Sequence, residues 1–183
     1  MALPDEKLQS NGLRLKGMKK AFSTEPSPEN IAHVIDLLGN MPRRLEDVCR
    51  GLNDARLQQP PVAGQRSFAE TLAHLIHCED RSSEAIYLAL LVNEPLVPEV
   101  HPERQWGKLL RYDLLDTSDL LVYFRMRREV LLRILGSLSA VQWARAIRET
   151  GKKRKESVYW RARAMALHEL EHLSDLEATL TTG

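Results

Sequence analysis

The stretch from Ser157 to Leu180 constrains the fold more than any other part of the sequence. It contains no glycine and no proline, and it is rich in Ala, Leu, Glu, Arg and Met, which are strong helix formers. Its apolar stripe recurs at steps of three and four, the period of one helix face. The stripe consists of Val158, Ala162, Met165, His168, His172 and Leu176. We therefore predict a long amphipathic helix that carries two histidines on its buried face.

These two histidines lie four residues apart, so they project one above the other from the same helix face. A buried polar side chain needs a partner, because an unsatisfied polar group costs stability. A metal ion shared by His168 and His172 would satisfy both. The simpler alternative is that each is a hydrogen-bonded core histidine. A catalytic zinc-type centre also needs a third protein ligand and an open position, so the remaining chain has to supply one more donor.

The first of three further predicted helices begins at residues 27–29. Ser-Pro-Glu combines a hydroxyl N-cap, a proline at the first helical position and an acid in the first turn. The helical period then continues to about Gly51. Pro42 lies inside it and is expected to kink or split the helix near Asn40.

Two more helices follow, separated by a long connection. Residues 53–65 are predicted to be a loop, after which residues 67–70 form a capping box that opens a helix to about Val92. The connection 93–116 contains three prolines and a tryptophan, and connections of this length often carry function or a short helix. A third helix runs from about residue 117 to 136.

This pattern predicts an all-α fold, a four-helix bundle with one long connection between helices 2 and 3. We expect residues 1–26 to form a tail that is mobile or drapes over the domain, and residues 27–183 to form that single domain. No β-rich segment is evident. Some apolar helix surface is expected to stay exposed, which makes a homodimer plausible.

Composition excludes several classes of function. The formal net charge of +1 gives no electrostatic case for nucleic-acid binding or for an anionic membrane surface. No apolar run reaches the ~18 residues of a membrane span, and the N-terminus lacks the apolar core of a secretory signal. Two cysteines are too few for a disulfide scaffold. We expect a cytoplasmic protein that acts on a small-molecule substrate.

The motif His168-Glu169-Leu170-Glu171-His172 formally matches the zinc-protease pattern H-E-x-x-H and its inverted form H-x-x-E-H. The metzincin continuation fails, because Asp175 stands where glycine is needed and Ala178 where histidine is needed. A di-iron carboxylate bundle needs Glu-x-x-His on two helices, and this chain has it on one. Both interpretations are therefore disfavoured.

The leading third ligand is His74, which lies on a small, polar stripe of the second helix. This stripe comprises Ser67, Thr71, His74, Cys78 and Ala85. A stripe of this kind beside the core is suited to line a cavity.

Taken together, the motifs resemble the DinB-like superfamily of metal-binding four-helix bundles. The resemblance rests on Ser67-x-x-Glu70-x-x-x-His74-Leu75 with Glu79, then Leu138-Ser139, Trp143 and Gly151, then His168-Glu169-x-x-His172-Leu173. It covers about residues 28–181. The family pattern has one histidine in the second helix and His-x-x-x-His in the fourth, which implies that His74, His168 and His172 are the metal ligands.

Three neutral imidazoles suit one divalent zinc, nickel or iron ion and leave coordination positions open. Such an ion lowers the pKa of a water or of a thiol towards neutrality. Members that share this pattern include S-transferases and isomerases that use a low-molecular-weight thiol cosubstrate such as bacillithiol, mycothiol or glutathione, and others described as hydrolases. The resemblance thus implies a metal-dependent thiol S-transferase or small-molecule hydrolase. The alternative is a non-catalytic stress-response or small-molecule-binding bundle whose metal is structural or absent.

Other residues near these motifs are weaker candidates. Glu169 and Glu171 are candidate general bases, although an ion pair or a solvated position is the more common role. Cys78 lies one turn past His74, and His77 is placed to reach the cavity edge. The basic run at 152–155 could attract an acidic thiol, but a solvated loop is the favoured interpretation.

Overall fold

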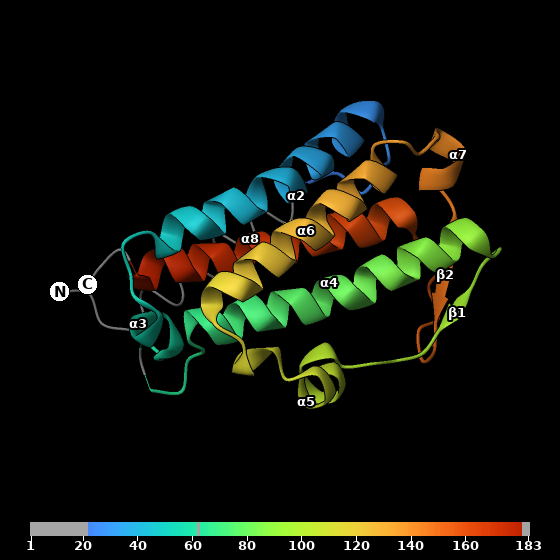
Figure 1. Ribbon diagram of the computed structural model, residues 1–183. Coiled ribbons are helices and arrows are strands. Elements are labelled where there is room, and N and C mark those ends of the chain that lie inside the picture. Colours follow the sequence, from blue (N-terminus) through green and yellow to red (C-terminus); the bar gives the residue numbers. More distant parts are fainter. Residues whose placement is uncertain (1–21, 62, 181–183) are drawn as a thin grey trace, which may run out of the picture.

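The computed structural model describes residues 22–61 and 63–180. Four long helices dominate it, namely α2 (Pro28–Cys49), α4 (Phe68–Leu91), α6 (Thr117–Leu135) and α8 (Val158–Leu180). They pack side by side as a bundle (Figure 1). The prediction of an all-α four-helix bundle is confirmed, and the four helices begin and end within two residues of the expected positions.

The order of the helices around the bundle differs from their order in the chain. α2 packs against α6 and α8, and α4 packs against the same two helices. Consecutive helices α2 and α4 therefore stand at opposite corners, as do α6 and α8. This arrangement places α4 directly beside α8, which brings together the two helices that carry the histidine motifs.

The helix starts form as the sequence predicts. The Ser27 hydroxyl accepts a hydrogen bond from the Asn30 amide, and Ser67 and Glu70 form both bonds of the capping box. Pro42 does not split α2, which corrects the expectation of a break near Asn40. Proline removes the amide that would bond to the carbonyl of Leu38. That carbonyl instead accepts a hydrogen bond of 2.7 Å from Arg128 Nη1 on α6. The Leu38 carbonyl is therefore satisfied although Pro42 cannot donate to it.

Two other expectations are corrected by short elements. The segment predicted as a loop between residues 53 and 65 contains a helical turn, α3 (Asp54–Gln58). A three-stranded sheet of order β1-β2-β3 caps one end of the bundle, where no β structure was expected. Its strands are β1 (Leu96–Val97), β2 (Ala146–Glu149) and β3 (Glu156–Ser157), with β1 parallel and β3 antiparallel to β2.

The long connection before α6 is ordered and lies along α4. It comprises the π-helix η1 (Pro102–Trp106), α5 (Gly107–Leu110) and the 3-10 turn η2 (Tyr112–Leu114). A further turn, α7 (Ala140–Trp143), follows α6. The expectation that this connection carries a short helix is confirmed. η1, α5 and η2 all contact α4, so they form a wall over one face of that helix.

The bundle interior consists of two apolar clusters separated by a charged one. One cluster surrounds Leu38, Ile86 and Tyr159, and the other surrounds Leu72, Phe124 and Leu173. Between them lies a fully buried guanidinium, that of Arg128, with two fully buried glutamates. This charged cluster borders the histidines, because Glu169 directly follows His168 in α8.

The basic run at 152–155 is engaged in local contacts. Lys152 pairs with Glu149 and Glu156, Lys155 pairs with Glu94, and the guanidinium of Arg154 lies 4.6 Å from the Trp160 ring centroid. These contacts belong to the β-sheet end of the molecule. The run therefore serves the loop structure there.

The N-terminal segment is described only from residue 22 onwards, so most of the predicted tail lies outside the described residues. The carbonyl of Phe22 accepts a hydrogen bond from Arg163, and that of Ser23 accepts one from the Tyr159 hydroxyl. This part of the tail is docked on α8. Among the described helices, none has the length and apolar character needed to cross a membrane.

Candidate metal centre

The structure brings together the three histidines that the sequence singled out. His74 projects from α4, and His168 and His172 project from successive turns of α8. His168 Nε2 lies 3.3 Å from His74 Nε2 and 3.1 Å from His172 Nε2. The ring centroids are 4.6 to 5.1 Å apart, and the three rings are steeply inclined to one another. His168 Nε2 is thus close to the Nε2 atom of each of the other two rings.

The spacing of these nitrogens fits a shared cation. Two nitrogens that each lie ~2.0–2.1 Å from a tetrahedral zinc ion are about 3.3 Å apart. The two distances of 3.3 and 3.1 Å are close to this value. Without a cation, His168 Nε2 has to face two other ring nitrogens with one proton or one lone pair. The donor set therefore fits a single divalent ion held by three imidazoles.

The environment keeps His74 and His172 neutral, which is the form that binds a metal. Burial lowers the pKa of His74 to about 3, with further lowering by the charge of Arg66 and by the other histidines. Burial also lowers the pKa of His172 to about 4, assisted by His168 and Arg66 and opposed by Glu171. Because both values lie well below neutral pH, these imidazoles offer lone pairs without first losing a proton.

A second grouping of possible ligands involves Cys78. One atom each of His74, Cys78 and His168 lie within 4.8 Å of one another. The sulphur is 3.7 Å from His74 Nε2 and 3.8 Å from Nδ1. Since it is almost equally distant from both ring nitrogens, it lies beside the ring and not in the direction of the Nε2 lone pair. The three-histidine set therefore fits a cation better than the set with the cysteine.

Glu169 is buried on α8 next to His168, and its side chain is turned about 100° round the helix from that histidine. Its two carboxylate oxygens accept hydrogen bonds of 2.6 and 3.0 Å from Arg128. Arg128 also donates to Glu79 on α4 at 3.2 Å. The expectation of Glu169 as a general base does not fit this arrangement, because both of its oxygens are engaged in a buried ion pair. Its role is to tie α8 to α6 one residue away from His168.

Glu171, unlike Glu169, has an electrostatic effect on the histidine cluster. It is half-buried on α8, and its charge raises the pKa of the adjacent His172. Its candidacy as a base stays a prediction.

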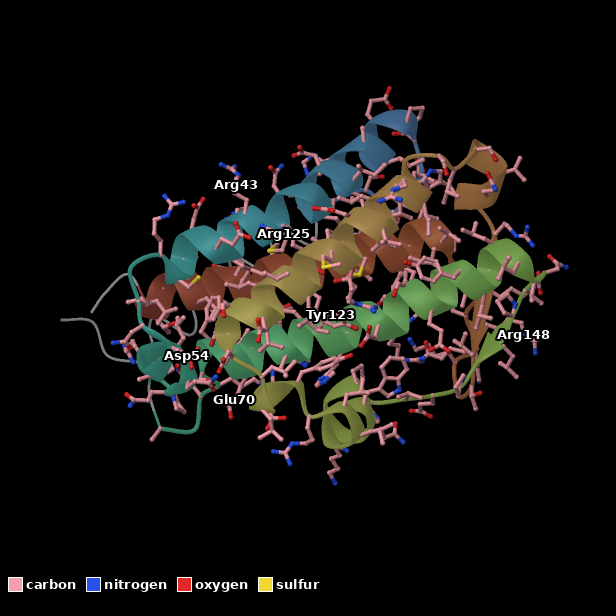
Figure 2. The ribbon with its side chains drawn as sticks, viewed as in Figure 1. Arg43, Asp54, Glu70, Tyr123, Arg125 and Arg148 are labelled. Carbon is pink, nitrogen blue, oxygen red and sulfur yellow. The ribbon has the colours of Figure 1, made fainter. Side chains whose placement is uncertain are left out.

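A pocket of about 550 Å³ opens beside His74. It lies between the first half of α4 and the wall formed by α5 and η2. The residues that line it are Arg66, Glu70, Ala73, His74, His77, Gly107, Lys108, Arg111 and Asp113. Figure 2 shows Glu70 on the side of α4 that faces this connection. The pocket gives a small molecule access to His74.

His77 forms part of the pocket wall. It is buried and stacks on Tyr112, with ring centroids 5.0 Å apart and planes 17° apart. A Cβ at Gly107 would lie 3.3 Å from His77 Cε1, so the absence of a side chain there lets the connection approach the imidazole closely. The expectation that His77 reaches the cavity edge is confirmed.

Sequence reasoning missed the pocket cations Arg66 and Lys108. Both lie outside the four long helices, where no periodicity indicates which way a side chain points. The signal that was available is the ordered character of the connection, with its three prolines and Trp106. It indicated a functional segment but not the residues that face α4.

Comparisons with known proteins agree with this architecture. The sequence profile of the DinB superfamily matches residues 37–176. Among solved structures, the chain is similar to YfiT from Bacillus subtilis, described as a probable metal-dependent hydrolase with an unusual four-helix bundle topology. The TM-score is 0.74 at 19% sequence identity, over 87% of this chain and 89% of that one. At this identity, the likeness establishes the fold. No curated protein matches the chain.

Proposed function

This chain belongs to the DinB superfamily, and from that premise we propose that it is a metal-dependent enzyme acting on a small molecule. His74, His168 and His172 would hold one divalent zinc, nickel or iron ion. The observation that carries the proposal is the convergence of their Nε2 atoms at 3.1 and 3.3 Å beside an open pocket. The description of YfiT as a probable metal-dependent hydrolase also supports this proposal.

When bound, such an ion supplies Lewis acidity that brings the pKa of a water or of a thiol towards neutrality. Among the described residues, three histidines converge on the site and Cys78 lies to one side. A three-ligand site keeps room for a nucleophile, whereas a structural zinc site is closed by four protein ligands. This favours an enzyme over a bundle with a purely structural metal.

The surrounding residues position the ligands and shape access to them. The Arg128 ion pairs hold α4 and α8, which carry the histidines. His77, packed between Gly107 and Tyr112, closes one wall of the pocket. Solvent and substrate then reach His74 through the space between α4 and α5. With a metal ion held by His74, His168 and His172, hydrolysis would use a water as nucleophile and S-transfer would use a thiol.

The test is the metal content of the tag-free protein by mass spectrometry, compared with His172→Ala. We expect about one zinc, nickel or iron ion per chain in the parent protein and a large loss in the variant, since one of three ligands is removed. Far-UV circular dichroism confirms that the variant is folded.

Turnover is then measured with the loaded protein against ester, amide and electrophilic substrates, each with and without a small thiol. Thiol-dependent product identifies an S-transferase, and thiol-independent product identifies a hydrolase. A folded parent protein that cannot be loaded with any of these ions would overturn the proposal and leave the small-molecule-binding alternative.

A further inference from the structure

The pocket beside His74 has an excess of positive charge on its walls. Three cationic side chains line it, those of Arg66, Lys108 and Arg111, against the carboxylates of Glu70 and Asp113. In the basic run at the far end of the molecule, by contrast, Lys152 and Lys155 pair with carboxylates. The charge inside the pocket therefore depends on which of its groups are already neutralised.

Arg111 and Asp113 neutralise each other. Arg111 Nε donates to Asp113 Oδ1 at 3.0 Å, and Nη2 donates to Oδ2 at 2.9 Å. Arg111 adopts a left-handed backbone conformation with φ of 48°, which is uncommon for a residue with a side chain. The turn of the chain and this two-point ion pair together fix the rim of the pocket. Arg111 contributes shape there more than free charge.

Glu70 is committed to the helix start. Its Oε2 accepts a hydrogen bond of 2.7 Å from the Ser67 amide in the capping box. This carboxylate compensates the positive end of α4. The Glu70 carboxylate therefore interacts mainly with the N-terminus of α4, although its negative charge also contributes to the potential in the pocket.

Of the three cations that line the pocket, Arg66 and Lys108 have no carboxylate partner among residues 22–61 and 63–180. They come from opposite sides of the pocket, Arg66 from the segment before α4 and Lys108 from α5. Both cations line the same pocket as His74, which is one of the candidate metal ligands.

On the basis of the proposed function, we infer that the substrate is a small anion, whose carboxylate or phosphate group is bound by Arg66 and Lys108 while its reacting centre lies at His74. A guanidinium suits this role because it offers paired donors that match either oxyanion. A divalent ion on three neutral histidines adds further positive charge to the same space. An uncharged analogue would leave these cations without a partner.

The test is calorimetric titration of the full-length protein with acetate, methyl phosphate and acetamide. Acetate and methyl phosphate separate the two sources of negative charge, and acetamide is the neutral match for acetate. Each titration is made on the zinc-loaded protein and on the same protein after chelation, with metal stoichiometry measured in every sample. The variants are Arg66→Gln, Glu70→Gln and, as a control for loss of charge, Arg43→Gln. Arg43 is exposed on α2, on the opposite side of the bundle from Glu70 (Figure 2).

We expect Arg66→Gln to weaken anion binding about tenfold, which corresponds to losing one charged hydrogen-bonding partner. Glu70→Gln is expected to tighten binding by about twofold to fivefold, because glutamine preserves the capping box while removing a negative charge. Arg43→Gln should bind as the parent protein does. Because the two pocket variants are expected to change the affinity for the anion in opposite directions, a general loss of folding could not explain both results.

Equal affinity of the parent protein and Arg66→Gln for both anions, or acetamide binding as tightly as acetate, would overturn the inference. This result together with normal metal stoichiometry would leave the proposed function intact. Conversely, anion binding that depends on Arg66 in protein that takes up no metal would support the anion subsite and count against the metal-dependent enzyme.

Discussion

Replacing Arg128 with methionine tests the buried charged cluster at the centre of the bundle. The guanidinium is 1% exposed and donates to Leu38 O on α2, to Glu79 on α4 and to Glu169 on α8. Methionine fills much of the same volume but leaves two buried carboxylates without their cation. Removing one partner from a buried ion pair costs about 3–5 kcal/mol. The Leu38 carbonyl also loses its donor, which adds about 1–3 kcal/mol if no water replaces it. A loss of this size is a large fraction of the ~5–15 kcal/mol that stabilises a typical domain.

The cost of Arg128→Met should depend on pH with a definite sign. Burial raises the pKa of Glu169 from 4.5 to about 7, and Arg128 opposes this rise. Without Arg128, the folded-state pKa rises further above the unfolded value. A carboxyl group with a raised folded-state pKa binds its proton more tightly when folded, so stability falls as pH increases through this window. The variant should therefore be least impaired near pH 4.5, where Glu169 is protonated, and most impaired above neutral pH.

The assay is urea unfolding followed by far-UV circular dichroism at about pH 5 and about pH 8, on either side of the folded-state titration. Arg125→Met is the matched control, because Arg125 lies on the same helix and pairs with Glu46 at 3.3 Å while remaining 48% exposed. We expect it to cost ~1 kcal/mol or less. Adding Glu169→Gln to Arg128→Met should recover part of the loss at the higher pH. A cost for Arg128→Met below ~1 kcal/mol, or one that is equal at both pH values, would refute this account of the cluster.

Two further predictions concern the histidine cluster. In the cobalt(II)-loaded protein, Cys78→Ser should leave metal stoichiometry and the near-ultraviolet spectrum unchanged, because the sulphur lies beside the His74 ring; a thiolate charge-transfer band that the substitution abolishes would instead place Cys78 among the ligands. In the metal-free protein, His74 and His172 should contribute a loss of stability as pH falls from about 6.5 towards 4, because unfolding frees them to take up protons that the folded state excludes. Glu169 contributes the opposite slope, but it does so in the parent protein and in His74→Gln/His172→Gln alike. The parent protein should therefore lose more stability than this double variant over that pH range in urea titrations, and equal slopes would contradict the assigned pKa shifts.

The long helices were predictable because their signals are local. Ser27 and Ser67 cap helices with bonds to residues three positions away, and the apolar period is visible within one turn. The effect of Pro42, in contrast, depends on a contact with a residue that is distant in the sequence. Its expected effect follows from the lost bond to Leu38, but the compensating donor is Arg128, some ninety residues further along the chain. No local pattern indicates that contact.

The ligand set and the substrate pocket differ in predictability for a similar reason. His74, His168 and His172 lie on helical stripes, so the period indicates that all three face inwards. Arg66 and Lys108 lie in connecting segments, where side-chain direction depends on how the segment packs against α4. The small sheet escaped notice because strands of two to four residues are too short to show an alternating pattern.

The charged cluster and the histidine cluster are built on the same two helices, α4 and α8. His74 and Glu79 lie five residues apart on α4, and His168 and Glu169 are adjacent on α8, so the helices that supply the three imidazoles also supply the carboxylates held by Arg128. Apolar packing alone tolerates small sliding of one helix along another, whereas hydrogen bonds to a rigid guanidinium are directional. A slide of α8 by one residue rise, ~1.5 Å, would amount to about half of the 3.1 to 3.3 Å that separates the Nε2 atoms. The buried ion pairs are therefore placed where a fixed register between α4 and α8 matters most, which accounts for a charged group between the two apolar clusters of the interior.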